Sequence, residues 1–183
     1  MLDINFQPFP VLITKRLTLR QINEDDKNDL FVLRSDNNVM QFIDKPKAKS
    51  PDDAAKLIRL ITDALNNNEG ITWGITLKKG GGLIGTIGYW RIVKEHYRAE
   101  IGYLLHSGHQ GKGLMQEAIS CVLGYGFKTM KLHSIEANVN PANAASIKLL
   151  KKNSFIREAY FKENYYYEGR FLNSVVYSLL TSS

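Results

Sequence analysis

A glycine-rich segment between an apolar strand and an apolar helix constrains the fold of this chain more than any other feature. Residues 98–105, RAEIGYLL, have the pattern of a strand, and residues 111–127, GKGLMQEAISCVLGYGF, are apolar over more than half of a helical circumference. Between them lies the glycine-rich segment 107–113, SGHQGKG. Glycines at such a junction let backbone N–H groups wrap an anion, and the helix dipole adds to the attraction. We therefore predict a pyrophosphate-binding loop, although a plain glycine-rich turn would have the same composition.

Two familiar phosphate-binding motifs do not match this segment. A P-loop needs Ser or Thr after its lysine to bind magnesium, but Lys112 is followed by Gly113. The dinucleotide fingerprint needs a third glycine, and Gln116 stands at that position. The loop would therefore bind a phosphate through its backbone rather than through either motif.

Strand and helix patterns alternate along the rest of the chain. We predict further strands in residues 16–22, 71–77, 83–93, 133–139, 155–161 and 171–180. Capping signals predict further helices after Asn23, after Ser50-Pro51 and from Asn140-Pro141, read as the cap and the first helical residue. With the segments above, this order predicts an α/β fold of about seven strands and four helices, forming one domain over residues 1–183.

Composition narrows the class of protein. Hydrophobic residues make up 44% of the 183 residues, which is typical of a globular domain, and we expect no membrane span because no apolar run approaches the required length. The formal net charge of +6 favours anionic partners, but the basic residues are scattered, so a solvated basic surface is favoured over a nucleic-acid stripe. The one cysteine, Cys121, suits the cytoplasm, and no Cys and His residues have zinc-site spacing.

A second motif occupies residues 138–155. Asn138 ends a predicted strand, Asn143 and Ser146 form N-x-x-S on the next helix, and Phe155 closes the segment. With the preceding strand, glycine loop and buried helix, this pattern resembles the Gcn5-related N-acetyltransferase (GNAT) superfamily. Within it, TKRLTLRQI, GTIGYW, AEIGYLL, HQGKGLMQEA and SVVYSLL resemble the branch that acetylates ribosomal-protein N-termini. The resemblance extends from about residue 14 to the end and implies a mixed, mostly antiparallel central sheet that splays in the middle.

The resemblance implies acetyl-CoA as the cofactor. Its pantetheine arm would lie between the splayed strands and bind the backbone of Tyr103, Leu104 and Leu105, and its pyrophosphate would bind the glycine loop. The further residues that the resemblance places at the cofactor are His109, Gln110, Gly111, Lys112, Gly113, Leu114, Met115, Asn138, Asn143 and Ser146. Asn143 and Ser146 match the positions that meet the pantetheine and the thiol, so both are candidate catalytic residues.

The chain departs from the superfamily pattern at three positions. Gly108 stands where an arginine or glutamine usually opens the loop, so a phosphate contact would come from His109 or Gln110 instead. Leu150 replaces the tyrosine that often protonates the leaving thiolate, which makes Ser146 the candidate acid. Ser154 replaces a glycine before Phe155, at a cost in left-handed backbone freedom.

Glu100 is the candidate base. By the two-residue period of a strand it shares a face with Gly102 and Leu104, on the strand expected to line the acceptor site. The alternative is a surface carboxylate paired with Arg98 or Lys94. The tyrosines of residues 164–169, NYYYEG, could line the acceptor pocket, but packing in a hairpin on the sheet is favoured.

These features predict an acetyl-CoA-dependent N-acetyltransferase that transfers the acetyl group directly to a primary amine. The acceptor could be a protein N-terminus, a polyamine or another small-molecule amine, and the sequence does not choose among them. The alternative from another class is a protein that binds acyl-CoA without catalysis, motivated by the missing tyrosine. The branch resemblance also hints at a homodimer.

Overall fold

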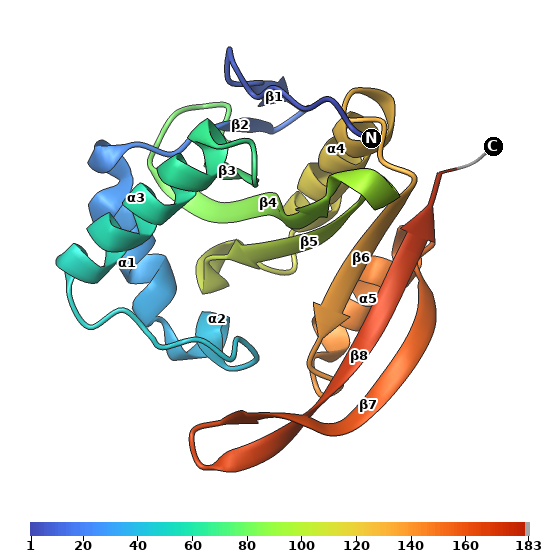
Figure 1. Ribbon diagram of the computed structural model, residues 1–183. Helices are drawn as coiled ribbons and strands as arrows, with labels where there is room; N and C mark the ends of the chain where they lie inside the picture. The colour runs from blue at the N-terminus through green and yellow to red at the C-terminus, as the bar shows by residue number, and fades with distance from the viewer. Residues whose placement is uncertain (182–183) are drawn as a thin grey trace.

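The computed structural model describes residues 1–181 and has one eight-stranded sheet with helices on both faces (Figure 1). The strands are β1 (Leu12–Ile13), β2 (Leu17–Gln21), β3 (Ile71–Leu77), β4 (Leu83–Val93), β5 (Arg98–Leu105), β6 (Ser134–Val139), β7 (Ile156–Tyr167) and β8 (Arg170–Leu180). The α-helices are α1 (Lys27–Ser35), α2 (Asn37–Met40), α3 (Pro51–Asn66), α4 (Leu114–Lys128) and α5 (Ala144–Lys152). The predicted α/β class is confirmed. The additional elements are the two-residue β1 and the four-residue α2, which are too short for a periodic signal.

The sheet divides into two parts where β5 meets β6. Its strand order is β1-β2-β3-β4-β5-β6-β8-β7, and all neighbours are antiparallel except β5 and β6. These two parallel strands pair only from Arg98 to Glu100 and from Ser134 to Glu136. Beyond those residues they diverge, so β5 has no strand neighbour on that edge from 101 to 105. The predicted splay is confirmed, and it leaves a gap in the middle of the sheet.

Two hydrophobic clusters attach the helices to the two faces of the sheet. The larger joins α4 and α5, through residues such as Ile119 and Leu150, to inward-facing strand residues such as Trp73 and Ile87. The smaller packs α1, α2 and α3 on the opposite face through Leu30, Leu33, Val39, Ala54 and Ile58, with Ile22 and Leu83. Figure 1 shows these two layers of helices on either side of the strands. Among the described residues, no helix is long and apolar enough to cross a membrane.

Of the three helix starts predicted from capping signals, the structure confirms two, at Asn23 and at Ser50-Pro51. Asn23 forms a capping box with Asp26 on a short 3₁₀ turn, Glu24–Asp26, that leads into α1. Pro51 opens α3 as predicted, although the Ser50 side chain makes no capping hydrogen bond. Instead the carboxylate of Asp53 accepts a hydrogen bond from the backbone N–H of Lys49 at 3.0 Å.

The predicted start of the last helix at Asn140-Pro141 is wrong. Asn140 closes a turn, because its side chain accepts the N–H of Ala142 and its carbonyl accepts that of Asn143, both at 2.9 Å. Asn143 is the actual cap of α5, and its side chain accepts the N–H of Ser146 at 3.0 Å. Both asparagines have capping chemistry, and the turn at 140–143 decides which of them begins the helix.

Candidate functional site

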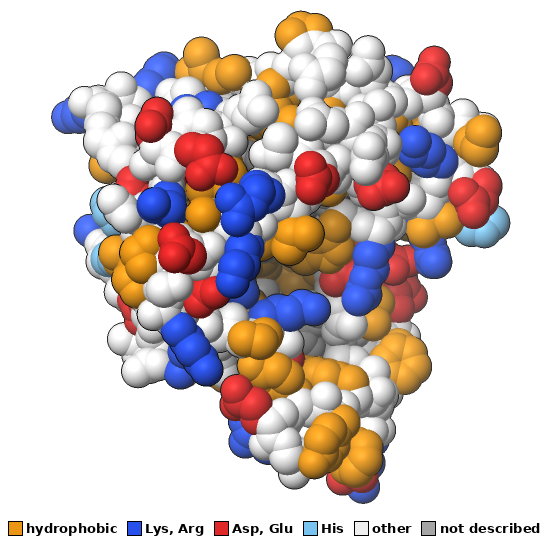
Figure 2. Space-filling view, turned by 60° about the vertical axis from the view of Figure 1, so that its left-hand side comes forward, with side chains coloured by type: hydrophobic (Ala, Val, Ile, Leu, Met, Phe, Trp, Pro, Cys, Tyr) orange, Lys and Arg blue, Asp and Glu red, His pale blue; other side chains and the backbone are white. Residues whose placement is uncertain are grey.

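A cavity opens where β5 and β6 diverge. It has a volume of about 590 Å³, and its walls come from α1, residues 42–45, α3, strands β3 to β6, the start of α5 and the end of β7. Figure 2 shows a hollow with hydrophobic side chains inside it and Lys and Arg side chains around it. We call this space the acceptor cavity.

A second cavity lies beside the glycine loop. It has a volume of about 450 Å³, and residues from the predicted cofactor set line it: Tyr103, Leu104, Leu105, Gln110, Gly111, Gly113, Leu114, Met115, Asn143 and Ser146. We call it the loop cavity. Asn138, also predicted at the cofactor, lines the acceptor cavity instead. His109 and Lys112 line neither cavity, since the Lys112 ammonium donates to the carbonyl of Gly108 at 2.6 Å and the His109 ring packs edge-on against His106.

The two cavities share one wall. The residues that line both are Phe42, Ile43, Tyr103, Leu104, Asn143 and Ser146. Tyr103 and Leu104 come from the part of β5 that pairs with β4 but no longer with β6, whereas Asn143 and Ser146 come from the start of α5. The splayed strands therefore bring both candidate residues of the N-x-x-S motif to the junction.

The Tyr103 and Ser146 hydroxyls lie 2.8 Å apart at this junction. Burial raises the pKa of Tyr103 to about 12, and the hydrogen bond with Ser146 opposes only part of that shift. The phenol therefore stays protonated near neutral pH and can always donate. The motif predicted Ser146, but the Tyr103 side chain was missed because only its backbone matched the family. Leu150, at the position of the missing tyrosine, is fully buried and lines neither cavity.

The glycine loop offers a row of backbone donors. Within residues 1–181, the N–H groups of residues 111–116 make no hydrogen bond to another part of the chain. Gly111 and Gly113 have φ of 72° and 71°, in the left-handed region, and Gly113 caps α4 without any side-chain contact to the helix. Free N–H groups at the start of a 15-residue helix fit a pyrophosphate without side-chain help. The loop therefore fits the phosphate end of acetyl-CoA.

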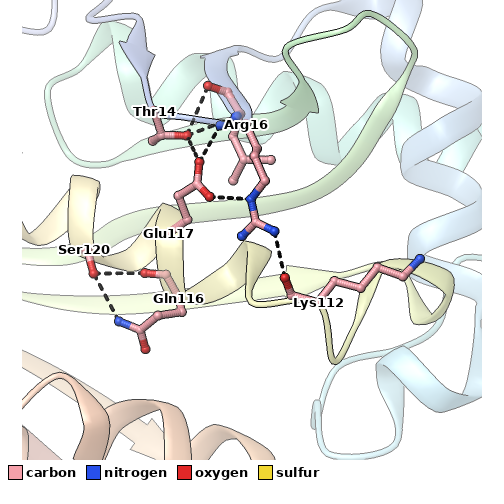
Figure 3. A network of polar contacts seen from close by, with 7 residues as sticks. Thr14, Arg16, Lys112, Gln116, Glu117 and Ser120 are labelled. Carbon is pink, nitrogen blue, oxygen red and sulfur yellow. Dashed lines mark hydrogen bonds and ion pairs between the residues drawn. The ribbon is translucent and has the colours of Figure 1, made fainter.

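An ion-pair network that sequence reasoning missed attaches this loop to the first strands (Figure 3). Glu117 on α4 accepts hydrogen bonds from the Thr14 hydroxyl at 2.5 Å, from the Arg16 N–H at 2.6 Å and from Arg16 Nε at 2.7 Å. Arg16 Nη1 also donates to the carbonyl of Lys112 at 2.9 Å. Burial alone would raise the pKa of Glu117, but these donors outweigh it and lower the pKa to about 2. More than 95 residues separate the partners along the chain, so no local pattern could indicate them.

Glu100 lines the acceptor cavity, and its side chain is 15% exposed. Its carboxylate pairs with Arg91 at 2.9 Å rather than with Arg98 or Lys94, because Arg98 pairs with Glu136 on the neighbouring strand at 3.0 Å. The bulge between β4 and β5 near Trp90 decides this pairing. Glu100 is thus both in an ion pair and at the cavity.

Charged and aromatic residues from segments without a readable motif also line the acceptor cavity. They are Arg34 on α1, Asp44 and Lys45 in the following loop, and Tyr165 on the hairpin. The Tyr165 hydroxyl donates to Asp44, and burial together with this carboxylate raises the pKa of the phenol. The favoured expectation that residues 164–169 only pack in a hairpin is therefore incomplete, because Tyr165 turns into the cavity.

The chain matches the family model described as acetyltransferase (GNAT) domain over residues 16–156. It belongs to the GNAT acetyltransferase family. A GNAT chain is an acyltransferase, and the family uses acetyl-CoA. The non-catalytic alternative receives no support from these comparisons.

Several N-acetyltransferases resemble this GNAT chain, and two of those described here are named for different acceptors. The uncharacterized N-acetyltransferase YoaA of Bacillus subtilis (strain 168) is 36% identical and covers 94% of this chain and 97% of its own. The [ribosomal protein uS5]-alanine N-acetyltransferase of Escherichia coli is 33% identical over 54% of this chain and 52% of its own. The crystal structure of spermidine N-acetyltransferase from Vibrio cholerae, in complex with CoA and spermine, is 25% identical, has a TM-score of 0.79, and covers 90% of this chain and 95% of its own.

Proposed function

We propose that this protein transfers an acetyl group from acetyl-CoA directly to a primary amine, which is either a protein N-terminus or a small-molecule amine held in the acceptor cavity. The observation that carries the proposal is the shared wall of the two cavities. A cofactor in the loop cavity and an amine in the acceptor cavity would meet at Tyr103, Asn143 and Ser146. Bound acetyl-CoA supplies the thioester carbonyl that the amine attacks and the thiol that leaves.

In this proposal the backbone does most of the cofactor binding. The free N–H groups of residues 111–116 bind the pyrophosphate, and the unpaired edge of β5 from 101 to 105 binds the pantetheine. The same edge presents N–H groups that can stabilise a carbonyl oxygen as it becomes negative. The Gln110 amide already donates to the carbonyl of Leu105 at 2.9 Å, which holds the loop against the end of this strand.

Glu100 acts as the base in this proposal. An amine acceptor is protonated near neutral pH and must lose a proton before it can attack. The Glu100 carboxylate faces the acceptor cavity and can accept that proton directly or through water. Its partner Arg91 is 72% exposed, so the ion pair can open at little cost.

Ser146 donates to the leaving sulfur in this proposal. Tyr103, held protonated by burial, donates to Ser146 Oγ and leaves the serine proton free to point at the sulfur. A serine hydroxyl is too weak an acid to give up its proton for good. Ser146 therefore stabilises the thiolate by hydrogen bonding until the thiolate takes up a proton that the amine has released.

The experiment measures thiol release with a panel of primary amines for the wild type, Asn143→Ala and Glu100→Gln. We expect Asn143→Ala to lower kcat for every accepted amine alike. Glu100→Gln should lower kcat/KM most near pH 7 and approach the wild type at pH values where the amine is already neutral. Glu136→Gln, a matched carboxylate change outside both cavities, is the control.

Two results would contradict this mechanism. A loss confined to one amine in Asn143→Ala would move this residue from the thiol end to acceptor recognition. Acetylated protein detected by intact-mass spectrometry after incubation with acetyl-CoA alone, and consumed on addition of an amine, would replace direct transfer with a covalent intermediate.

A further inference from the structure

The charges in the acceptor cavity are unevenly paired. Five ionisable side chains of Asp, Glu, Lys or Arg line it: Arg34, Asp44, Lys45, Arg91 and Glu100. Arg91 and Glu100 neutralise each other at 2.9 Å, and Asp44 accepts a hydrogen bond from the Tyr165 hydroxyl. Within residues 1–181, neither Arg34 nor Lys45 has a carboxylate within 4.0 Å.

Arg34 is the most informative of these residues because it is half-buried without a counter-ion. Among the described residues 1–181, its only side-chain hydrogen bond runs from Nη2 to the carbonyl of Pro46, at a long 3.4 Å. A guanidinium has five N–H donors in a planar fork, and leaving most of them unmatched away from water costs free energy. Burial accordingly lowers the pKa of Arg34, and a weaker interaction with the Tyr167 phenol opposes that shift.

The surroundings of Arg34 place it at the wall that the acceptor would touch. It lies one helical turn after Leu30 on α1, and both residues line the cavity opposite the strands. Asp44 and Lys45 follow in the loop after α2, and Tyr165 reaches this loop from the hairpin. This wall therefore holds one carboxylate and two cations, and neither cation forms an ion pair with a carboxylate in the described part of the chain.

We infer that the acceptor of this enzyme carries a carboxylate in addition to its amine, and that Arg34, assisted by Lys45, binds that carboxylate. The inference rests on the proposed function and specifies its substrate class. A carboxylate matches the guanidinium fork with two parallel hydrogen bonds. A polyamine would instead bring only positive charge to a wall where Asp44 alone offers an unneutralised negative charge. The carboxylate could belong to an acidic side chain of a peptide or to a free amino acid.

The experiment compares acceptors that differ only in charge. The peptide arm uses tripeptide amides with Glu, Gln or Lys at the second or third position, and the small-molecule arm uses a free amino acid and its amide, with spermidine as the polycation. Wild-type kcat/KM should be about tenfold or more higher for the carboxylate member of the favoured arm. The arm with the larger ratio identifies the source of the carboxylate.

Variants then test the residue. Arg34→Gln should remove the preference for the carboxylate by lowering kcat/KM for the carboxylate acceptor far more than for its neutral counterpart, and Arg34→Glu should favour the Lys peptide. Lys45→Gln should reduce the preference less than Arg34→Gln. Because Lys45 is exposed, this variant still tests the inference if the Arg34 variants fail to fold. Arg59→Gln, an exposed arginine on α3 outside both cavities, is the matched control and should retain the full preference.

Calorimetric titration of the carboxylate acceptor into the CoA-bound protein gives a second readout that does not depend on turnover. Binding at least about tenfold weaker in Arg34→Gln than in Arg59→Gln supports the inference. Equal kcat/KM for the carboxylate member and its neutral counterpart in both arms, equal binding by the two variants, or a preference for spermidine overturns it while leaving amine acetylation intact. Failure of the wild type to acetylate any amine would instead overturn the proposed function, and the calorimetric comparison would still decide the role of Arg34.

Discussion

At the scale of single residues, the junction depends on one pair of hydroxyls. Tyr103 and Ser146 lie 2.8 Å apart, and the tyrosine pKa of about 12 makes it a permanent donor. We predict that Tyr103→Phe lowers kcat by about fivefold, since one hydrogen bond is worth about 1 kcal/mol, while the Kd for acetyl-CoA stays unchanged. The double variant with Ser146→Ala should lose no more than the worse single variant, because both changes break one chain of donors. Steady-state kinetics and calorimetry check this prediction, with Tyr160→Phe on the exposed hairpin as the control. Independent, multiplicative losses in the double variant would contradict the coupling.

At the scale of elements, Glu117 joins α4 to the first strands and holds the glycine loop in place through Arg16 (Figure 3). Folding lowers the pKa of this carboxylate from 4.5 to about 2. A lowered carboxyl pKa stabilises the fold above the unfolded value and loses that effect as the pH falls. We predict that Glu117→Gln lowers the melting temperature by a few degrees at pH 7, and that its difference from the wild type shrinks from pH 4.5 toward pH 2. The variant should also raise the Kd for acetyl-CoA, because the loop loses its support. Thermal unfolding across this pH range checks the effect, with Glu24→Gln at an exposed position as the control. A difference that is constant with pH would show that the charge of Glu117 does not matter.

At the scale of the whole molecule, the sheet is two parts joined by a short parallel contact. Only Arg98–Glu100 and Ser134–Glu136 pair across the boundary between β5 and β6. A ligand in the gap would contact both parts and stabilise the folded state. We predict that acetyl-CoA at 100 times its Kd adds about 2.7 kcal/mol of stability, which raises the melting temperature by roughly 5–10 °C for a chain of this size. ATP and NAD, which offer phosphates without pantetheine, should give a smaller rise in the same thermal-shift assay. An equal rise with ATP would mean that the loop alone binds the ligand and that the gap is not bridged.

Local patterns in the sequence were enough for most of the elements. The structure has a helix at the apolar stripe after Pro51, a strand at the alternation around Leu17, and a helix that starts after the glycine loop, as predicted. Periodicity and capping depend on residues close together in the sequence, so they can be recognised without knowledge of the fold. The start of α5 was missed because Asn140 and Asn143 are equally good caps, and the choice depends on how the chain turns after β6.

The family motif indicated Asn143 and Ser146, and the two-residue period of the strand indicated Glu100, but neither pattern showed what surrounds these residues. Tyr103 meets Ser146 across 43 positions, Arg16 meets Glu117 across 101, and Asp44 meets Tyr165 across 121. The sequence by itself determined most of the elements and the glycine loop, and it proposed candidate residues for the chemistry. Only the tertiary structure decided which of them share a wall, because that depends on where β5 and β6 part and on which helices and loops cover the gap. Contacts between distant segments follow from strand register and packing, which no local pattern encodes.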